Sequence, residues 1–272
     1  MFEFIARARE KRTSCKAAAP SPAISAGYSW RVPGGEVARL SQYVLEGGAH
    51  VMIAGNTRSG KSTLLHGIMA DALKQYAPSE AGLVLLDPKR IELRRYKDLP
   101  HTVRYANDED GAIEALRYVQ AVMEARYREL EQAELTADTP KYQGQRLYVV
   151  IDELIPLMIG PRKKEFVSLL MLLLSQAGAA NIWFIVGTQA PKRSIIPGEI
   201  MLYFTLVIGL SMASAVESRC ALGVKGCESL PLHGKAIVKY GPELMTASIP
   251  NTDLRSVAEL VSYWTSASCK VA

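Results

Sequence analysis

The sequence is poor in cysteine, and its four thiols form neither a CxxC pair nor a cluster with histidine at metal-ligand spacing. This pattern excludes a structural zinc site and indicates reduced thiols, so we expect a cytoplasmic protein. The cysteines are Cys15, Cys220, Cys227 and Cys269.

Long hydrophobic runs are also scarce. Two uncharged stretches, residues 166–191 and 200–216, come nearest, but the first contains Gln176 and Asn181 and the second is short. A transmembrane helix needs about 20 predominantly apolar residues, so we predict buried segments and no intrinsic membrane span. Residues 1–16 lack the apolar core of a signal peptide.

Aromatic residues are few, at 7%, yet 49% hydrophobic and 22% charged residues indicate a folded globular protein. The net charge of +5 permits a polyanionic partner without requiring one. We assign residues 39–251 to one domain, residues 252–272 to a C-terminal helix, and residues 1–38 to a basic arm and linker. The arm is either a frayed tail or a contact to a phosphate backbone or anionic membrane, through Arg7, Arg9, Lys11, Arg12 and Lys16.

Short apolar runs alternate with longer helical patterns from His50 onward. Each run is nearly continuous in apolar residues, as expected of parallel strands that are covered on both faces. The alternation predicts an α/β fold with a mainly parallel central sheet and helices on both faces. The expected strands are residues 50–54, 82–87, 146–152, 181–188 and 205–210.

Three further elements are predicted. Residues 110–134 carry apolar side chains at three- and four-residue steps, which is typical of an amphipathic helix. Residues 235–240 and 244–249 flank a Gly-Pro-Glu turn and predict a hairpin. Asn251 is expected to cap a last helix over residues 252–264.

A glycine-rich loop follows the first strand. Residues 55–62 read GNTRSGKS and match G-x-x-x-x-G-K-[ST] in full. Because this loop lies between a buried strand and a helix, we expect its backbone N–H groups to surround the phosphates of ATP. Lys61 is expected to bridge the β- and γ-phosphates, and the Ser62 hydroxyl to ligate Mg²⁺. The predicted nucleotide-binding residues are Gly55, Asn56, Thr57, Arg58, Ser59, Gly60, Lys61, Ser62 and Thr63, of which Arg58 is outside the required pattern.

Acidic residues that could hold magnesium end the strand at residues 146–152. Asp152 and Glu153 stand at its carboxyl end, where ligands bind in open α/β sheets. We expect this strand to neighbour the phosphate-loop strand, Asp152 to hold Mg²⁺ through water, and Glu153 to polarise the attacking water as general base. Thr188 and Gln189 end another strand and could report on the γ-phosphate.

The combination of motifs resembles the motor domain of the FtsK/SpoIIIE DNA translocases over about residues 40–250. The segments that carry the resemblance are GNTRSGKST, LVLLDPKRIELRRYKDLPH, ALRYVQAVMEARY, VVIDEL, GTQAP and ESRCALGVKGCESLPLHGKA. The resemblance implies a RecA-like P-loop NTPase that hydrolyses ATP with Mg²⁺ and moves double-stranded DNA through a homo-oligomeric ring, usually a hexamer. The family's transmembrane region and winged-helix module are missing, which suggests a motor of a mobile element, plasmid or phage and leaves a membrane-bound partner protein open.

The sequence departs from the family at two arginine positions. Ala190 follows the Thr-Gln pair where the family often has arginine, and residues 205–207 lack the arginine that commonly leads the next strand. Arg219 is retained, so we expect it to act in trans on the nucleotide of a neighbouring subunit. An intrachain ion pair with Glu217 or Glu228 is the alternative.

Two basic loops follow the acid-bearing strand and the Thr-Gln strand. A protein that handles DNA without reading its sequence needs lysine and arginine contacts to phosphates. The predicted DNA-binding residues are Arg162, Lys163, Lys164, Lys192 and Arg193, with ordinary solvated charge as the alternative.

Two other functions are compatible with these motifs. One is an ATP-dependent coupling or docking module that engages a protein substrate in a conjugation or secretion machine. The other is a nucleotide-binding scaffold of low turnover, which Ala190 and Val207 favour. The intact Lys61, Asp152 and Glu153 oppose the scaffold.

Overall fold

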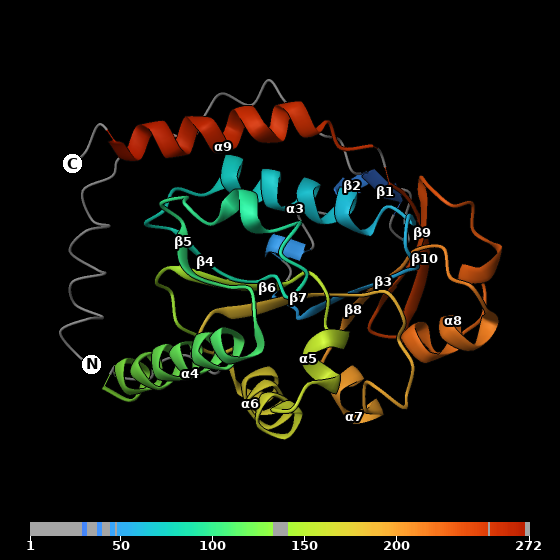
Figure 1. Ribbon diagram of the computed structural model, residues 1–272, viewed down its shortest axis with the longest axis horizontal. Helices are drawn as coiled ribbons and strands as arrows, with labels where there is room; N and C mark the ends of the chain where they lie inside the picture. Colours follow the sequence, from blue (N-terminus) through green and yellow to red (C-terminus); the bar gives the residue numbers. More distant parts are fainter. Residues whose placement is uncertain are drawn as a thin grey trace.

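A ten-stranded sheet between two layers of helices forms the centre of the structure (Figure 1). This computed structural model describes residues 29–31, 37–39, 44–46, 48–132, 141–249 and 251–269. The cations of the predicted basic arm lie outside the described residues. Within those residues, no helix combines the length and the apolar character needed to cross a membrane.

Parallel strands make up the larger part of the sheet, in the order β8-β3-β7-β6-β4-β5. Antiparallel strands continue it from β8 in the order β9-β10-β1-β2. The parallel strands are β3 (Val51–Ala54), β4 (Ala81–Leu86), β5 (Thr102–Ala106), β6 (Arg146–Ile151), β7 (Ile182–Thr188) and β8 (Leu206–Gly209). The antiparallel strands are β9 (Lys235–Tyr240), β10 (Glu243–Ser248), β1 (Ser29–Arg31) and β2 (Val37–Arg39).

The predicted fold class is confirmed, as are the hairpin β9–β10 and all of the predicted parallel strands. Strand β5 is the parallel strand that the sequence prediction missed. It lies at the edge of the sheet, where only Ala106 is fully buried and where Arg104 places its guanidinium over the ring of Tyr118. An edge strand lacks the continuous apolar run on which the prediction relied.

Alternating side chains of each parallel strand serve two separate hydrophobic cores. On β3, Val51 and Ile53 pack beneath helices α3 (Lys61–Gln75) and α9 (Leu254–Cys269). Met52 and Ala54 face the opposite helical layer. That layer contains α4 (Glu109–Gln132), α5 (Ile155–Ile159), α6 (Lys163–Gln176) and α7 (Gly198–Met201), and α8 (Ala215–Leu222) lies beside β8 (Figure 1). Each fully buried valine, leucine or isoleucine contributes about 1.5–3 kcal/mol, so the sheet is held rigidly and can fix the loops at its edge.

The amphipathic helix predicted at residues 110–134 is confirmed as α4. The last helix is also present, but the prediction that Asn251 caps it was wrong. Helix α9 begins at Leu254, and the Asp253 carboxylate accepts hydrogen bonds from the Arg255 backbone N–H at 3.0 Å and the Ser256 hydroxyl at 2.8 Å. Aspartate caps as well as asparagine does. Just before this cap, the Thr252 hydroxyl donates to the backbone carbonyl of Thr63 on helix α3 at 2.8 Å.

Candidate nucleotide-binding site

The glycine-rich loop joins the end of β3 to the start of α3 and is tied to both neighbouring strands. The backbone N–H of Gly55 donates to the carbonyl of Thr188 at 3.1 Å, and that of Asn56 donates to Ser211 at 3.0 Å. A Cβ on Gly55 would lie 2.7 Å from the Cβ of Leu210, so only glycine permits this approach. The loop is therefore held at the carboxyl edge of the parallel sheet.

The end of the loop turns sharply into α3. Gly60 has φ of +92° and Arg58 has φ of +67°, both in the left-handed region. Glycine adopts that region without strain, whereas arginine does not. Arg58 and Thr57 are exposed, and Ser59 is buried. Helix α3 begins at Lys61, directly after this turn. The first amides of a helix have no partner within the helix, which is the arrangement that binds phosphate.

Lys61 and Asp152 form a buried ion pair at the centre of the site. The Lys61 ammonium lies 2.8 Å from the Asp152 Oδ1 and 2.6 Å from the Asp152 carbonyl oxygen. Their side chains are 5% and 2% exposed. The structure thus brings together the two residues on which the sequence prediction depended most.

The expectation that β6 lies next to β3 was wrong, because β7 lies between them. Lys61 reaches Asp152 across the end of β7, over Gly187. A Cβ at Gly187 would lie 2.1 Å from the Asp152 carbonyl oxygen and 3.1 Å from the Lys61 ammonium. Gly187 is therefore a site residue that the sequence analysis missed, because a glycine within a strand does not by itself mark a site.

Glu153 is held in a fixed orientation beside this pair. Its side chain is 2% exposed, and one carboxylate oxygen lies 3.2 Å from the Lys89 ammonium. The other oxygen accepts the backbone N–H of Gln189 at 3.2 Å. The Gln189 side chain in turn accepts a hydrogen bond from the Thr57 hydroxyl at 3.4 Å. The structure therefore joins Glu153, Gln189 and the phosphate loop, and adds Lys89, which the sequence analysis had not placed at the site.

Two buried hydroxyls at the loop have no hydrogen-bond partner in the part of the chain that the structure describes. They belong to Ser59 and Thr188, which are 2% and 0% exposed. A pocket of about 430 Å³ opens beside Ser59. Its lining is Ser59, Gly60, Thr63, His233, Gly234, Ile249 and Asn251.

The donor set at this edge suits a nucleotide with magnesium. The described residues contain no cluster of three histidine, cysteine or carboxylate side chains able to enclose a metal. Mg²⁺ is commonly held by one or two carboxylates together with the substrate's phosphates, which matches the Ser62 hydroxyl and Asp152 beside a phosphate loop. The oxygen ligands therefore suit Mg²⁺, and the backbone amides of the phosphate loop suit a nucleotide.

Comparison with known proteins decides the family. A family model described as FtsK/SpoIIIE matches residues 34–226. The chain belongs to the FtsK/SpoIIIE family. A DNA translocase FtsK of Borreliella burgdorferi is 32% identical over 194 residues, which cover 66% of this chain and 24% of that protein. The chain thus spans about a quarter of the length of the curated FtsK relatives it matches.

Solved structures share the fold of this FtsK/SpoIIIE chain. The pCW3 conjugation coupling protein TcpA, determined with ATPγS, has a TM-score of 0.69 at 19% identity and covers 93% of this chain and 75% of its own. EssC from Geobacillus thermodenitrificans, ATPases 2 and 3, has a TM-score of 0.72 at 16% identity. The match covers 94% of this chain and 52% of the EssC chain. At these identities the likeness establishes the fold alone.

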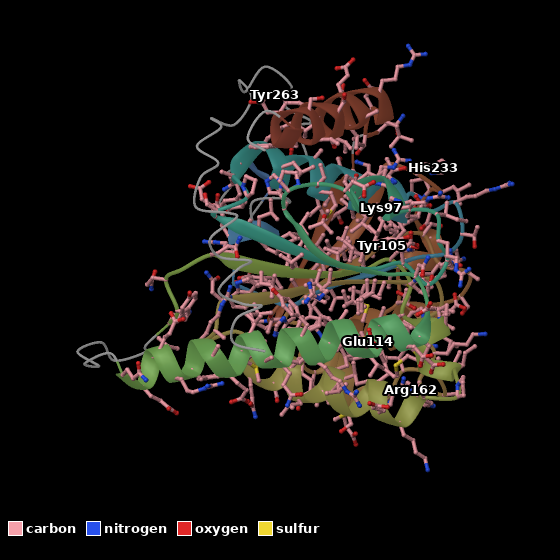
Figure 2. The ribbon with its side chains drawn as sticks, turned by 60° about the vertical axis from the view of Figure 1, so that its left-hand side comes forward. Lys97, Tyr105, Glu114, Arg162, His233 and Tyr263 are labelled. Carbon is pink, nitrogen blue, oxygen red and sulfur yellow. The ribbon has the colours of Figure 1, made fainter. Side chains whose placement is uncertain are left out.

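The five predicted DNA-binding cations of the FtsK/SpoIIIE chain fall into two groups. Arg162 lies just before α6 in the lower helical layer (Figure 2), where its guanidinium contacts Asp110 at 2.5 Å and Glu165 at 2.7 Å. The others form no ion pair with any residue that the structure describes. They are Lys163, Lys164, Lys192 and Arg193.

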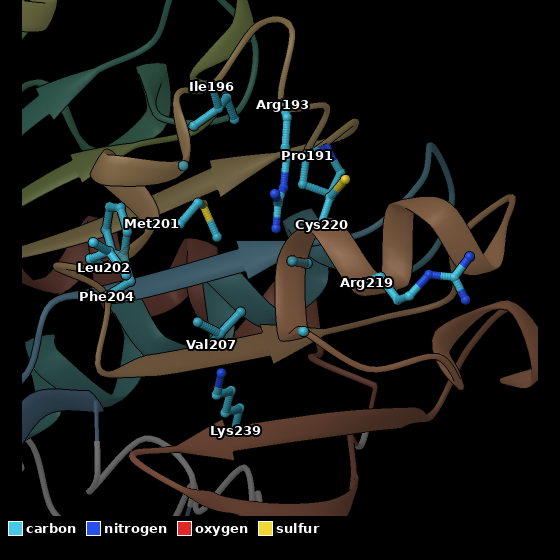
Figure 3. A pocket seen from close by; sticks show the side chains of 13 residues that line it. Pro191, Arg193, Ile196, Met201, Leu202, Phe204, Val207, Arg219, Cys220 and Lys239 are labelled. Atoms are coloured by element: carbon cyan, nitrogen blue, oxygen red, sulfur yellow. The ribbon is translucent and has the colours of Figure 1, made fainter.

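Arg219 lies on α8 with its side chain exposed, at the rim of a second pocket of about 170 Å³. Figure 3 shows its guanidinium extending away from the pocket, whereas Arg193 points into it. The proposed intrachain ion pairs do not form within the described residues. Glu217 instead accepts the backbone N–H of Ala213 at 3.1 Å, and Glu228 accepts that of Gly226 at 2.8 Å.

Proposed function

We propose that this chain is an ATP-hydrolysing motor that moves double-stranded DNA as a homo-oligomeric ring. The observation that carries the proposal is the Lys61–Asp152 contact at 2.8 Å, with Glu153 fixed beside it at the mouth of a phosphate loop. These are the groups that phosphoryl transfer from ATP to water requires.

Each residue of the site has a part in the proposed reaction. Bound Mg²⁺ would neutralise charge on the transferred phosphoryl group. The Ser62 hydroxyl and Asp152 would hold it, and Lys61 would move from Asp152 to the phosphate oxygens. Glu153 would accept the proton of the attacking water, and Gln189 would orient that water.

The pocket beside the loop is proposed to receive the nucleoside. His233 overhangs the phosphate loop, with Nδ1 about 4.0 Å from the position that a Gly60 Cβ would take. Asn251 lines the same pocket from the chain segment before α9. An imidazole and an amide provide a stacking surface and hydrogen-bonding groups for a base.

DNA contacts are proposed for Lys163, Lys164, Lys192 and Arg193, which follow the carboxyl ends of β6 and β7. Phosphate contacts of this kind bind DNA without regard to sequence. Arg162 is better suited to anchoring its loop, since Asp110 and Glu165 already hold its guanidinium. We further propose that the motor is cytoplasmic and belongs to a mobile element, plasmid or phage. It would act with or without a membrane-bound partner protein.

The deciding experiment is the ATPase rate of the purified chain with and without duplex DNA, together with its mass in solution. We expect DNA to raise the rate, the mass to be that of an oligomer, and Lys61→Ala to abolish turnover. A rate that DNA leaves unchanged, in a protein that hydrolyses ATP, would contradict the motor.

A coupling or docking module is the second candidate, because TcpA and EssC share the fold. That function predicts ATPase activity that responds to a protein substrate and is insensitive to duplex DNA. Turnover that stays very slow with both partners would instead favour the nucleotide-binding scaffold.

A further inference from the structure

The second pocket, of about 170 Å³, is lined by residues of α7, β8, α8 and β9. Its walls include the buried side chains of Phe204 and Val207. Leu202, which also lines the pocket, is 80% exposed, and Leu244, which pairs with Lys239 across the β9–β10 hairpin, is exposed as well. Apolar surface that gathers around a hollow in this way is typical of a contact with another protein.

Two cations point into this pocket. Figure 3 shows the Arg193 guanidinium and the Lys239 ammonium directed toward its interior from opposite sides. The Lys239 ammonium lies 3.7 Å from the position that a Cβ would take on Gly223, at the end of α8. Among the residues that the structure describes, neither cation has an ion-pair or hydrogen-bond partner for its side chain. A carboxylate placed between them would complement both charges.

A carboxylate of a protein suits this pocket better than a phosphate of DNA does. The walls at Phe204 and Val207 are apolar, whereas protein–DNA interfaces are polar and strongly positive. The exposed Lys192 does not line the pocket and stays available to DNA. Of the proposed DNA contacts, only Arg193 is therefore reassigned.

The position of Arg219 indicates which protein supplies the carboxylate. Arg219 lines the same pocket and is exposed. Because we expect Arg219 to act on the nucleotide of a neighbouring subunit, that subunit must face this pocket. A ring of identical subunits joins two different faces of the chain, since its contacts are head-to-tail. The face that meets the pocket therefore lies elsewhere on the chain.

Helix α4 carries exposed acids at the opposite end of the same helical layer (Figure 1). It packs on β4 and β5 at one end of the row of parallel strands, whereas the pocket lies at β8, the other end. Glu114 and Glu124 are exposed on α4, and within the described part of the chain their carboxylates have no cation or hydrogen-bond donor as partner. Subunits arranged side by side in the plane of the sheet would bring this face to the pocket.

We propose that the second pocket is an interface site for a second copy of this chain, in which Arg193 and Lys239 receive a carboxylate from the exposed face of α4. The inference rests on the proposed ring and names the two surfaces that close it.

The test reverses the charges on each surface and measures self-association of the full chain by sedimentation, with a non-hydrolysable ATP analogue and Mg²⁺. The pocket variant carries Arg193→Glu and Lys239→Glu. The helix variant carries Glu114→Lys and Glu124→Lys. Each should raise the dissociation constant of the oligomer about tenfold or more, because like charges then face each other. The variant with all four changes should recover association, since opposite charges face each other again.

A variant with Lys192→Glu and Lys225→Glu is the matched control. It makes the same change in net charge on exposed side chains that lie near the pocket in sequence but do not line it. Should the pocket variant fail to fold, as judged by circular dichroism, Arg193→Ala with Lys239→Ala removes the charges without reversing them. That variant should still associate more weakly than the control.

Three results would overturn the inference. Association of the pocket variant that equals that of the control leaves the proposed ring intact and removes only this interface. The same holds if the variant with four changes associates no better than the pocket variant. If the pocket variant assembles normally and binds duplex DNA more weakly, the pocket belongs to the DNA contacts instead. An unaltered chain that stays monomeric would remove the proposed ring together with its interface.

Discussion

At the scale of single residues, the site depends on contacts that short motifs do not contain. The loop pattern led directly to Lys61, and the acids at the end of a strand led to Asp152 and Glu153. The passage of Lys61 over Gly187 could not be predicted, because it depends on β7 lying between β3 and β6. A glycine within a strand can equally mark a bulge or a bend of the backbone.

Gly187→Ala is therefore expected to disturb the site directly. The new Cβ would meet the backbone of Asp152 at 2.1 Å, and a backbone atom cannot move aside easily. We expect a loss of about 1–3 kcal/mol in unfolding free energy, measured in urea, and weaker nucleotide binding. Gly198→Ala is the control, because nothing lies within 4 Å of its added Cβ. Equal behaviour of the two variants would contradict the role assigned to Gly187.

His50 predicts a dependence of stability on pH. It is 7% exposed, and burial lowers its pKa from 6.5 to about 4. Between these two pKa values, His50 binds more protons in the unfolded chain than in the folded one. The contribution of His50 to stability is therefore fully present above pH 6.5 and is lost as the pH falls toward 4. The loss should reach about 3 kcal/mol.

Unfolding midpoints measured from pH 7.5 to 4.5 check this expectation. His50→Asn retains an acceptor for the backbone N–H of Phe184, which His50 Nδ1 accepts at 3.1 Å. The variant should lose part of the acid sensitivity even if it is less stable at pH 7. If the variant and the unaltered protein lose stability equally as the pH falls, groups other than His50 cause the acid sensitivity.

At the scale of elements, the sequence predicted the helices and strands that have a clear pattern of buried apolar residues. It missed features that depend on how the elements pack together. Strands covered on both faces produced clear apolar runs, and the turn of the β9–β10 hairpin carried its own signal. Strand β5 was missed because an edge strand is half exposed. The cap of α9 was misplaced by two residues because Asn251 and Asp253 have similar capping propensity, and only packing decides between them.

Helix α9 is expected to stabilise the helical layer above the phosphate loop. Trp264 is 0% exposed and donates its indole N–H to the Leu73 carbonyl at 2.9 Å. Its ring packs edge-on against the ring of His101, with the ring centroids 4.8 Å apart. Trp264→Ala should lower the unfolding free energy by about 3–5 kcal/mol. Ser262→Ala, an exposed position of α9, serves as the control in the same denaturation experiment. A small effect would mean that α9 is dispensable for the core.

At the scale of the whole molecule, assembly is the property that a single chain cannot display. The α/β architecture followed from alternating strand and helix patterns, whereas a ring depends on surfaces whose partners are other subunits. Arg219 illustrates this difference. Its exposure, and the other engagements of Glu217 and Glu228, agree with a role across a subunit boundary.

Mixing of variants tests that role. Arg219→Ala should reduce the ATPase rate about 10³-fold, whereas Lys225→Ala, a nearby exposed cation, should not. If Arg219 acts in trans, subunits with Arg219→Ala mixed with subunits with Lys61→Ala should regain part of the activity, since each supplies what the other lacks. No recovery on mixing would place any effect of Arg219 within its own chain.

The pairing of Lys61 with Asp152 also sets a condition on what can enter the site. Separating a buried ion pair leaves each charge uncompensated, at a cost of several kcal/mol. A lone anion would compensate the charge of the Lys61 ammonium but leave the Asp152 carboxylate without a partner. A lone cation would compensate Asp152 and leave Lys61 without a partner. Only a ligand that carries charges of both signs at the right separation would compensate both residues at once, and the proposed complex of nucleotide with magnesium is such a ligand.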